Sequence, residues 1–160
     1  MALYVAQAQD VNLNEPIIFE ASSPCPRGNV FHENQTGNFY LRGNTCNCFA
    51  RYKVTCQGNV AIPTGGAVTP VAVAITVGGT PRPNSRSIVT PAAVDQYGNF
   101  VATDTITVPR DMNFEISAEY VSGVTDGTTV PTPTVNIING SIEINRIARK
   151  AIRYERRKTS

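Results

Sequence analysis

The sequence of 160 residues has few charges, a single histidine and no tryptophan. Charged residues make up 16% of the chain, below the usual quarter, so its solubility depends on Thr, Asn, Ser and Gln. No apolar run approaches the roughly 18–20 residues that cross a bilayer, and the first residues do not resemble a secretory signal. We therefore expect a protein made in the cytoplasm without a signal peptide or membrane span, which stays in the cell that makes it or leaves it by lysis.

The residues needed for catalysis are also scarce. The chain has one histidine, His32, and no nucleophile motif such as Gly-x-Ser-x-Gly. Neither Gly65-Gly66 nor Gly78-Gly79 is followed by the Lys-Ser/Thr of a phosphate loop. Glu115 and Glu119 share one strand face, but four residues of extended chain place them about 13 Å apart, too far for direct acid–base cooperation. We expect no enzyme activity and no cofactor.

Four cysteines stand at positions 25, 46, 48 and 56. Cys46 and Cys48 form a C-x-C pair, which differs from the C-x-x-C of zinc knuckles and redox sites, and a bond between them would be strained. A metal site from these cysteines and His32 is one interpretation. The favoured one is free thiols that act as small buried hydrophobes, because unpaired cysteine is often buried.

Charge is distributed unevenly along the chain. Residues 1–145 carry 7 basic and 11 acidic side chains, whereas residues 146–160 carry 7 basic side chains and one acidic. The basic tail is typical of a segment that docks on an acidic protein surface or on nucleic acid, and the alternative is a solvated terminus. One aromatic residue, Tyr154, does not make a base-stacking platform, so nucleic acid is the less favoured partner. The expected docking residues are Arg149, Lys150, Arg153, Arg156, Arg157 and Lys158.

Apolar residues recur with a period of two over most of the chain, and Gly and Pro punctuate it. This pattern predicts about nine short strands and an all-β sandwich or barrel. Residues 122–134 have no period and are expected to form an exposed loop. The predicted strands are 16–20, 29–33, 38–42, 49–56, 71–77, 87–90, 100–108, 113–120 and 135–147, the last in two pieces.

The segment Val71–Val77 is apolar on both faces, because Ala72 and Ala74 alternate with the larger residues. A strand covered on both sides needs a second packing surface. In a two-layer protein of this size, the simplest second surface is another subunit.

The strand order resembles the tumour-necrosis-factor-like jelly roll. The residues that carry the resemblance are 38–43, 50–55, 71–77, 108–116 and the final Ser141-Ile-Glu-Ile-Asn-Arg-Ile147. The family includes the C-terminal domains of spore-surface collagen-like glycoproteins and small phage particle proteins. The resemblance implies a single antiparallel jelly-roll domain over residues 15–147, with an N-terminal arm at 1–14 and the basic tail at 148–160. It also implies a homotrimer, for which we expect the interface residues Val71, Ala72, Val73, Ala74, Ile75, Phe114 and Tyr120.

The chain further resembles small proteins encoded among the head genes of tailed phages. The expected function is therefore that of a structural virion protein, a capsid decoration or head-surface protein that binds the major capsid protein. The alternative is a trimeric receptor- or glycan-binding module of a fibre or spore surface. Glycan sites usually present an aromatic plane, best of all tryptophan, which leaves Tyr97 or Tyr40 for that role.

Overall fold

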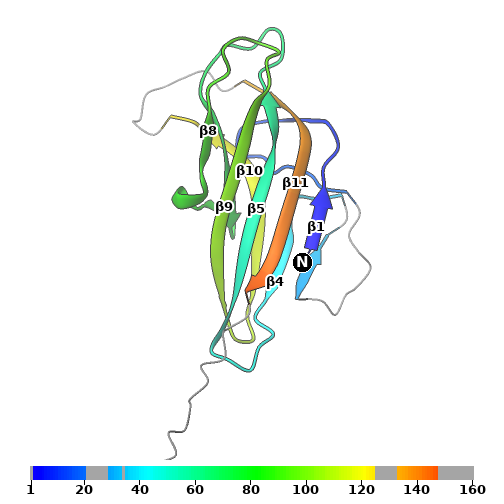
Figure 1. The fold of residues 1–160 in the computed structure, drawn as a ribbon, viewed down its shortest axis with the longest axis vertical. Coiled ribbons are helices and arrows are strands. Elements are labelled where there is room, and N and C mark those ends of the chain that lie inside the picture. The colour runs from blue at the N-terminus through cyan, green and yellow to red at the C-terminus, as the bar shows by residue number, and fades with distance from the viewer. Residues whose placement is uncertain (1, 21–28, 34, 125–132, 148–160) are drawn as a thin grey trace, which may run out of the picture.

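Two antiparallel sheets pack face to face in the computed structural model, which describes residues 2–20, 29–33, 35–124 and 133–147 (Figure 1). Sheet A has the strand order β1-β11-β5-β9, and β2 also pairs with β11. Its strands are β1 (Ala2–Val5), β2 (Gln9–Val11), β5 (Phe49–Ala61), β9 (Gly98–Pro109) and β11 (Val135–Ile147).

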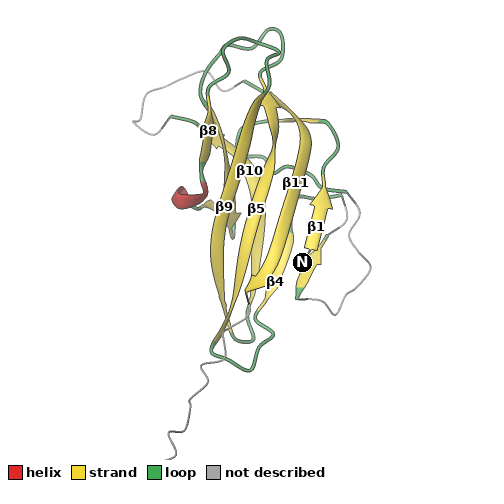
Figure 2. Cartoon of the chain, viewed as in Figure 1, coloured by secondary structure: helices red, strands yellow, loops and turns green. Residues whose placement is uncertain are grey.

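Sheet B has the order β3-β4-β10-β6-β7, and β8 also pairs with β6. A single turn of 3-10 helix, η1 (Pro83–Ser85), lies beside β8 (Figure 2). The strands are β3 (Val30–His32), β4 (Phe39–Arg42), β6 (Val71–Val77), β7 (Thr80–Pro81), β8 (Ser87–Val89) and β10 (Asn113–Ser122). The all-β sandwich expected from the sequence is confirmed.

Alternation of apolar and polar residues decides which face of each strand enters the core. Along β5 every second residue from Ala50 is buried and those between are exposed or half-buried. The strand is longer than predicted, because Gly58 continues it instead of turning the chain. A Cβ at this position would stand 3.0 Å from the Phe100 ring, so the glycine gives that ring its place in the core.

The core between the sheets is aliphatic and aromatic, and it contains few polar groups. The hydroxyl of buried Tyr52 donates a hydrogen bond to the Arg42 carbonyl of sheet B at 2.6 Å, so this polar group has a partner. Burial of such side chains, each contributing about 1.5–3 kcal/mol, drives the packing of the two sheets. Its largest fully buried members include Tyr52, Tyr120, Phe19, Phe39, Phe100, Ile17, Leu41 and Ile62.

The first residues belong to the sandwich and do not form the arm expected at 1–14. β1 pairs with β11 from Ala2↔Ile144 to Val5↔Ser141, and β2 pairs with the same strand at Val135–Ile137. A bulge in β11 between Ile138 and Ser141 separates the two pairings, and the Gly140 carbonyl accepts from the Ala6 N–H at 2.8 Å. Both short strands therefore complete one edge of sheet A.

β6 is buried on both faces, but the chain itself covers the second face. Ala72 and Ala74 pack with Val121 of β10, and residues from β7 to η1 lie over them. The apolar second face therefore requires no other subunit, which removes the reason for placing an interface there.

Candidate interaction surface

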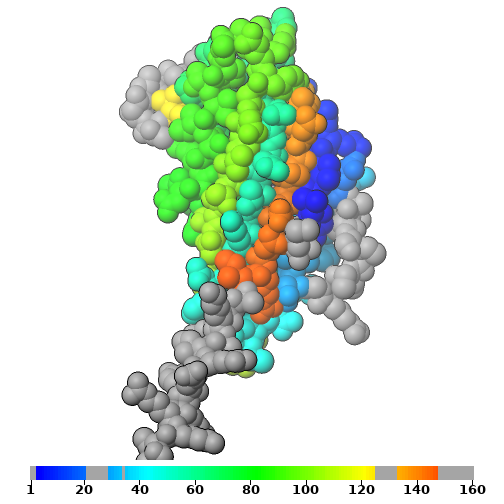
Figure 3. Space-filling model, in the orientation of Figure 1, coloured from blue at the N-terminus to red at the C-terminus, as the bar shows by residue number. Residues whose placement is uncertain are grey.

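The outer face of sheet A is left uncovered by the described chain. Figure 3 shows β9, β5, β11 and β1 side by side across the face toward the viewer, with no described segment laid over them. The outer face of sheet B differs, since the bridge Pro16↔Glu119 and the segment around η1 cover part of it. An open sheet face of this breadth is a natural site for self-association or partner binding.

Apolar side chains lie at two opposite edges of this face. Leu3 and Val5 on β1 are 57% and 56% exposed, and Val101 on β9 is 45% exposed. The register connects them in one row across the sheet, because Val5 faces Ser141, Ser141 faces Gln57, and Gln57 faces Val101. Exposed apolar side chains therefore lie at both ends of one row, with two polar residues between them.

The centre of the face is polar, and it carries the charges of Arg51 and Lys53 on β5 and of Glu143 on β11. Thr55 pairs with Thr103 through their hydroxyl groups at 3.1 Å, and Asn145 donates to the Glu143 carboxylate at 2.7 Å. Hydroxyls and amides paired within their own sheet present methyl groups and satisfied dipoles outward. These pairs are desolvated on association at a lower cost than the charged side chains among them.

A hydrogen-bond chain closes one end of the face. Tyr97 donates to the Asn136 side-chain oxygen at 2.7 Å, and the Asn136 amide donates to Asp10 at 3.0 Å. The exposed ring of Tyr97 is thereby fixed against sheet A. Tyr40, the other aromatic considered for a glycan, is half-buried beside Phe31 at 6.0 Å between ring centroids.

The structure places the interface residues expected from the sequence in the interior. Val71, Val73, Ile75 and Tyr120 belong to the core between the sheets, and Phe114 packs against that core. With Ala72 and Ala74 covered by the chain, this set offers no accessible patch in the single chain. The docking residues expected in the tail, from Arg149 to Lys158, lie outside the described residues, as does most of the expected loop 122–134.

The cysteines divide between surface and core. Cys46 and Cys48 are exposed free thiols in the loop between β4 and β5, which corrects their expected burial. Cys56 is fully buried as expected, and burial raises the pKa of its thiol to about 12. Cys25 lies outside the described residues. Within the described ranges, no group of three or more His, Cys, Asp or Glu is placed to hold a metal ion.

His32 is a core residue. Its ring stacks on Phe39 with centroids 4.4 Å apart and lies 5.0 Å from the ring of Tyr4. Its Nε2 is 2.9 Å from the Thr36 carbonyl, while Nδ1 is buried without a partner. His32 is thus buried among aromatic rings, with one ring nitrogen bonded to a backbone carbonyl.

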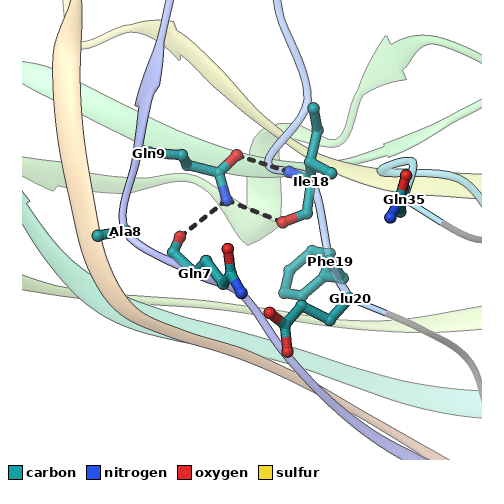
Figure 4. A pocket seen from close by; sticks show the side chains of 7 residues that line it. All are labelled: Gln7, Ala8, Gln9, Ile18, Phe19, Glu20 and Gln35. Carbon is teal, nitrogen blue, oxygen red and sulfur yellow. Dashed lines mark hydrogen bonds between the residues drawn. The ribbon is translucent and has the colours of Figure 1, made fainter.

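A pocket of about 560 Å³ with a mixed polar and apolar lining lies where the N-terminal strands meet residues 18–20 (Figure 4). The side-chain amide of Gln9 bonds to the backbone of Ile18 as a neighbouring strand would: it accepts from the Ile18 N–H at 2.8 Å and donates to the Ile18 carbonyl at 2.8 Å. The carboxylate of Glu20 and the amides of Gln7 and Gln35 also line it. The amide of Gln9 thus holds the chain at residue 18, where a regular strand was expected.

Comparisons with known proteins identify the fold. No protein-family model matches the chain, and no curated protein matches it in sequence. Among solved structures, the Eiger TNF of S. frugiperda superimposes with a TM-score of 0.60 at 8% identity, covering 94% of each chain. The globular domain of zebrafish complement 1qA superimposes with a TM-score of 0.50 at 8% identity, covering 93% of this chain and 98% of that one. The expected TNF-like jelly roll is therefore confirmed as the fold.

No helix among the described residues is long and apolar enough to cross a membrane.

Proposed function

We propose that this chain is a structural protein that assembles into a homotrimer through the outer face of sheet A. The observation that carries the proposal is the uncovered sheet with Leu3 and Val5 at one edge and Val101 at the other. The TNF-like fold supports it, since a trimer is what the resemblance in sequence implies. This placement replaces the one on Val71–Ile75, whose side chains are used inside the chain.

The position of the apolar residues favours a closed ring over a twofold dimer. A twofold interface brings one patch against itself, whereas a cyclic trimer brings one patch against a different patch of the next copy. Edges β1 and β9 supply two such patches, joined by one row of the sheet. Meeting edge to edge around an axis, three copies would enclose the polar centres of their sheets, including Arg51, Lys53 and Glu143.

Light scattering of the purified chain over a range of concentrations tests the assembly. We expect three chain masses for the wild type and a shift to monomer for Leu3→Asp, because the new carboxylate would be desolvated in each of three contacts. Ile88→Asp is the matched control, since Ile88 is 51% exposed but belongs to sheet B. A monomeric wild type, or Leu3→Asp that remains trimeric, would contradict the proposal.

We further propose that the trimer decorates a phage capsid and that the basic tail docks it on the major capsid protein. The support is the charge pattern of 7 basic groups in the last fifteen residues against an acidic body, together with the charge-poor surface. Mass spectrometry and immunogold labelling of particles released by the producing cells should find the chain on the virion surface. A chain truncated after Ile147 should remain trimeric yet be absent from particles, whereas particles that retain it would refute tail docking.

A further inference from the structure

The segment from β7 to β8 is fixed to the edge of β6 by specific hydrogen bonds. β7 pairs with Thr76 and Val77, and β8 pairs with Val71–Val73, which leaves Ala74 and Ile75 between them. The Ser85 hydroxyl fills this gap, accepting from the Ile75 N–H at 2.8 Å and donating to the Arg82 carbonyl at 2.7 Å. The Arg82 N–H donates to the Ile75 carbonyl at 2.8 Å. The backbone around η1 is therefore held in place without a ligand.

A pocket of about 170 Å³ lies between this segment and sheet B. Ala74, Val121, Pro81 and Pro83 form apolar walls, and Asn14, Arg82 and Arg86 contribute polar groups. It lies on the sheet opposite to the proposed trimer surface, on the flank that bears η1 in Figure 2. Trimer formation through sheet A would therefore leave it open.

The two arginines differ in their charge partners. Arg82 Nε donates to the Asp104 carboxylate at 2.8 Å, so its charge is compensated. The Arg86 side chain has neither a hydrogen bond nor an ion pair among the described residues, and its Nε is shielded from solvent with no acceptor. The side-chain amide of Asn14 is likewise without a hydrogen bond in this part of the chain. The pocket thus carries one uncompensated positive charge.

We propose that this pocket binds a carboxylate that bears a short aliphatic group. A guanidinium presents parallel N–H donors that match the two oxygens of a carboxylate, and the Nη groups of Arg86 have no acceptor among the described residues. The amide of Asn14 offers a further donor, while the proline, alanine and valine walls accept the aliphatic part. The volume suits a ligand with a few non-hydrogen atoms, since one water occupies roughly 30 Å³.

Titration with propionate at constant ionic strength tests this site, with the Arg86 Nε–Hε resonance in ¹H–¹⁵N spectra as the direct readout. We expect a saturable shift of that resonance with propionate and none with propionamide, which has the same shape without the charge. Arg86→Gln should weaken the binding about tenfold or more, because it removes the charge-assisted pair. Arg110→Gln is the control, as Arg110 is an exposed arginine in the turn between β9 and β10.

Arg86→Lys provides a second variant that keeps the charge and the aliphatic stem but loses the planar fork. It should bind more weakly than the wild type, and it decides the question if Arg86→Gln does not fold. A peptide ending in Ala-Ala distinguishes the source of the carboxylate: tighter binding than propionate assigns it to a chain terminus, weaker binding to a free acid. An unchanged Arg86 resonance, equal shifts with propionamide, or full binding by both Arg86 variants would overturn the proposal.

Discussion

Replacing Ser85 with Ala removes the hydroxyl that joins η1 to the edge of β6. Ile75 is fully buried, so its N–H loses its acceptor with no water to replace it, which costs about 1–3 kcal/mol. The Arg82 carbonyl still accepts from the N–H of residue 85 at 3.0 Å, so losing the second bond adds at most about 1 kcal/mol. We expect the free energy of unfolding to fall by about 2–3 kcal/mol, and the thermal midpoint by about 4–12 °C.

Urea unfolding at one fixed protein concentration measures this change, because assembly makes the apparent stability depend on concentration. Ser87→Ala is the control. Its hydroxyl accepts from the Val101 N–H at 3.2 Å, but that contact is exposed and water can replace it, so we expect about 0.5 kcal/mol or less. If Ser85→Ala destabilised the chain no more than Ser87→Ala, the hydroxyl would not be what holds the segment in place.

Other perturbations test the burial of single groups. Burial raises the pKa of Glu119 in the folded chain against the opposing hydrogen bond from Ser117, so ionisation favours unfolding and stability falls as pH rises through the range between the unfolded and folded pKa values. Glu119→Gln should therefore raise the urea midpoint at about pH 7 and leave it unchanged at about pH 3, where both side chains are neutral; equal midpoints at neutral pH would contradict this. His32→Phe keeps the ring stacking and removes the unpartnered Nδ1, which offsets the loss of the Nε2 bond to the Thr36 carbonyl, so its unfolding free energy should stay within about 1 kcal/mol of the wild type. His32→Ala should lose about 2–4 kcal/mol by calorimetry. Alkylation of the native chain followed by peptide mass mapping should label Cys46 and Cys48 and spare Cys56, and rapid labelling of Cys56 would show that the core opens more readily than its burial implies.

The strands were predictable from the sequence because apolar and polar side chains alternate along each of them. β6 has the bounds that the sequence predicts, and β5 and β10 begin at predicted residues. Errors arose where a local signal had two interpretations. Gly58 is typical of a turn, yet in β5 it makes room for a neighbouring ring. The arm was expected because the resemblance begins at residue 15, whereas the structure pairs β1 with β11.

The candidate surface was harder to predict, since it depends on which outer face the rest of the chain covers. The doubly apolar pattern of Val71–Val77 correctly indicates two buried faces, but it does not say what buries the second one. The segment around η1 covers that face, and the Ser85 hydroxyl and the Arg82 N–H hold the segment there by hydrogen bonds to Ile75 of β6. Leu3 and Val5 indicate a candidate contact surface only once β1 is known to lie at a sheet edge with these two side chains exposed.

The pairing of the first strands with the last one sets the order in which the domain can be completed. Within the described chain, β1 and β2 find their only sheet partner in β11, which ends at Ile147. During synthesis, residues 2–11 leave the ribosome long before β11 is made. Their backbone groups therefore have no sheet partner while the intervening strands are synthesised. Closing so long a loop costs entropy before any contact repays it, which makes slow folding characteristic of such topologies. The edge of sheet A that presents Leu3 and Val5 therefore cannot be completed before residues 135–147 have been synthesised.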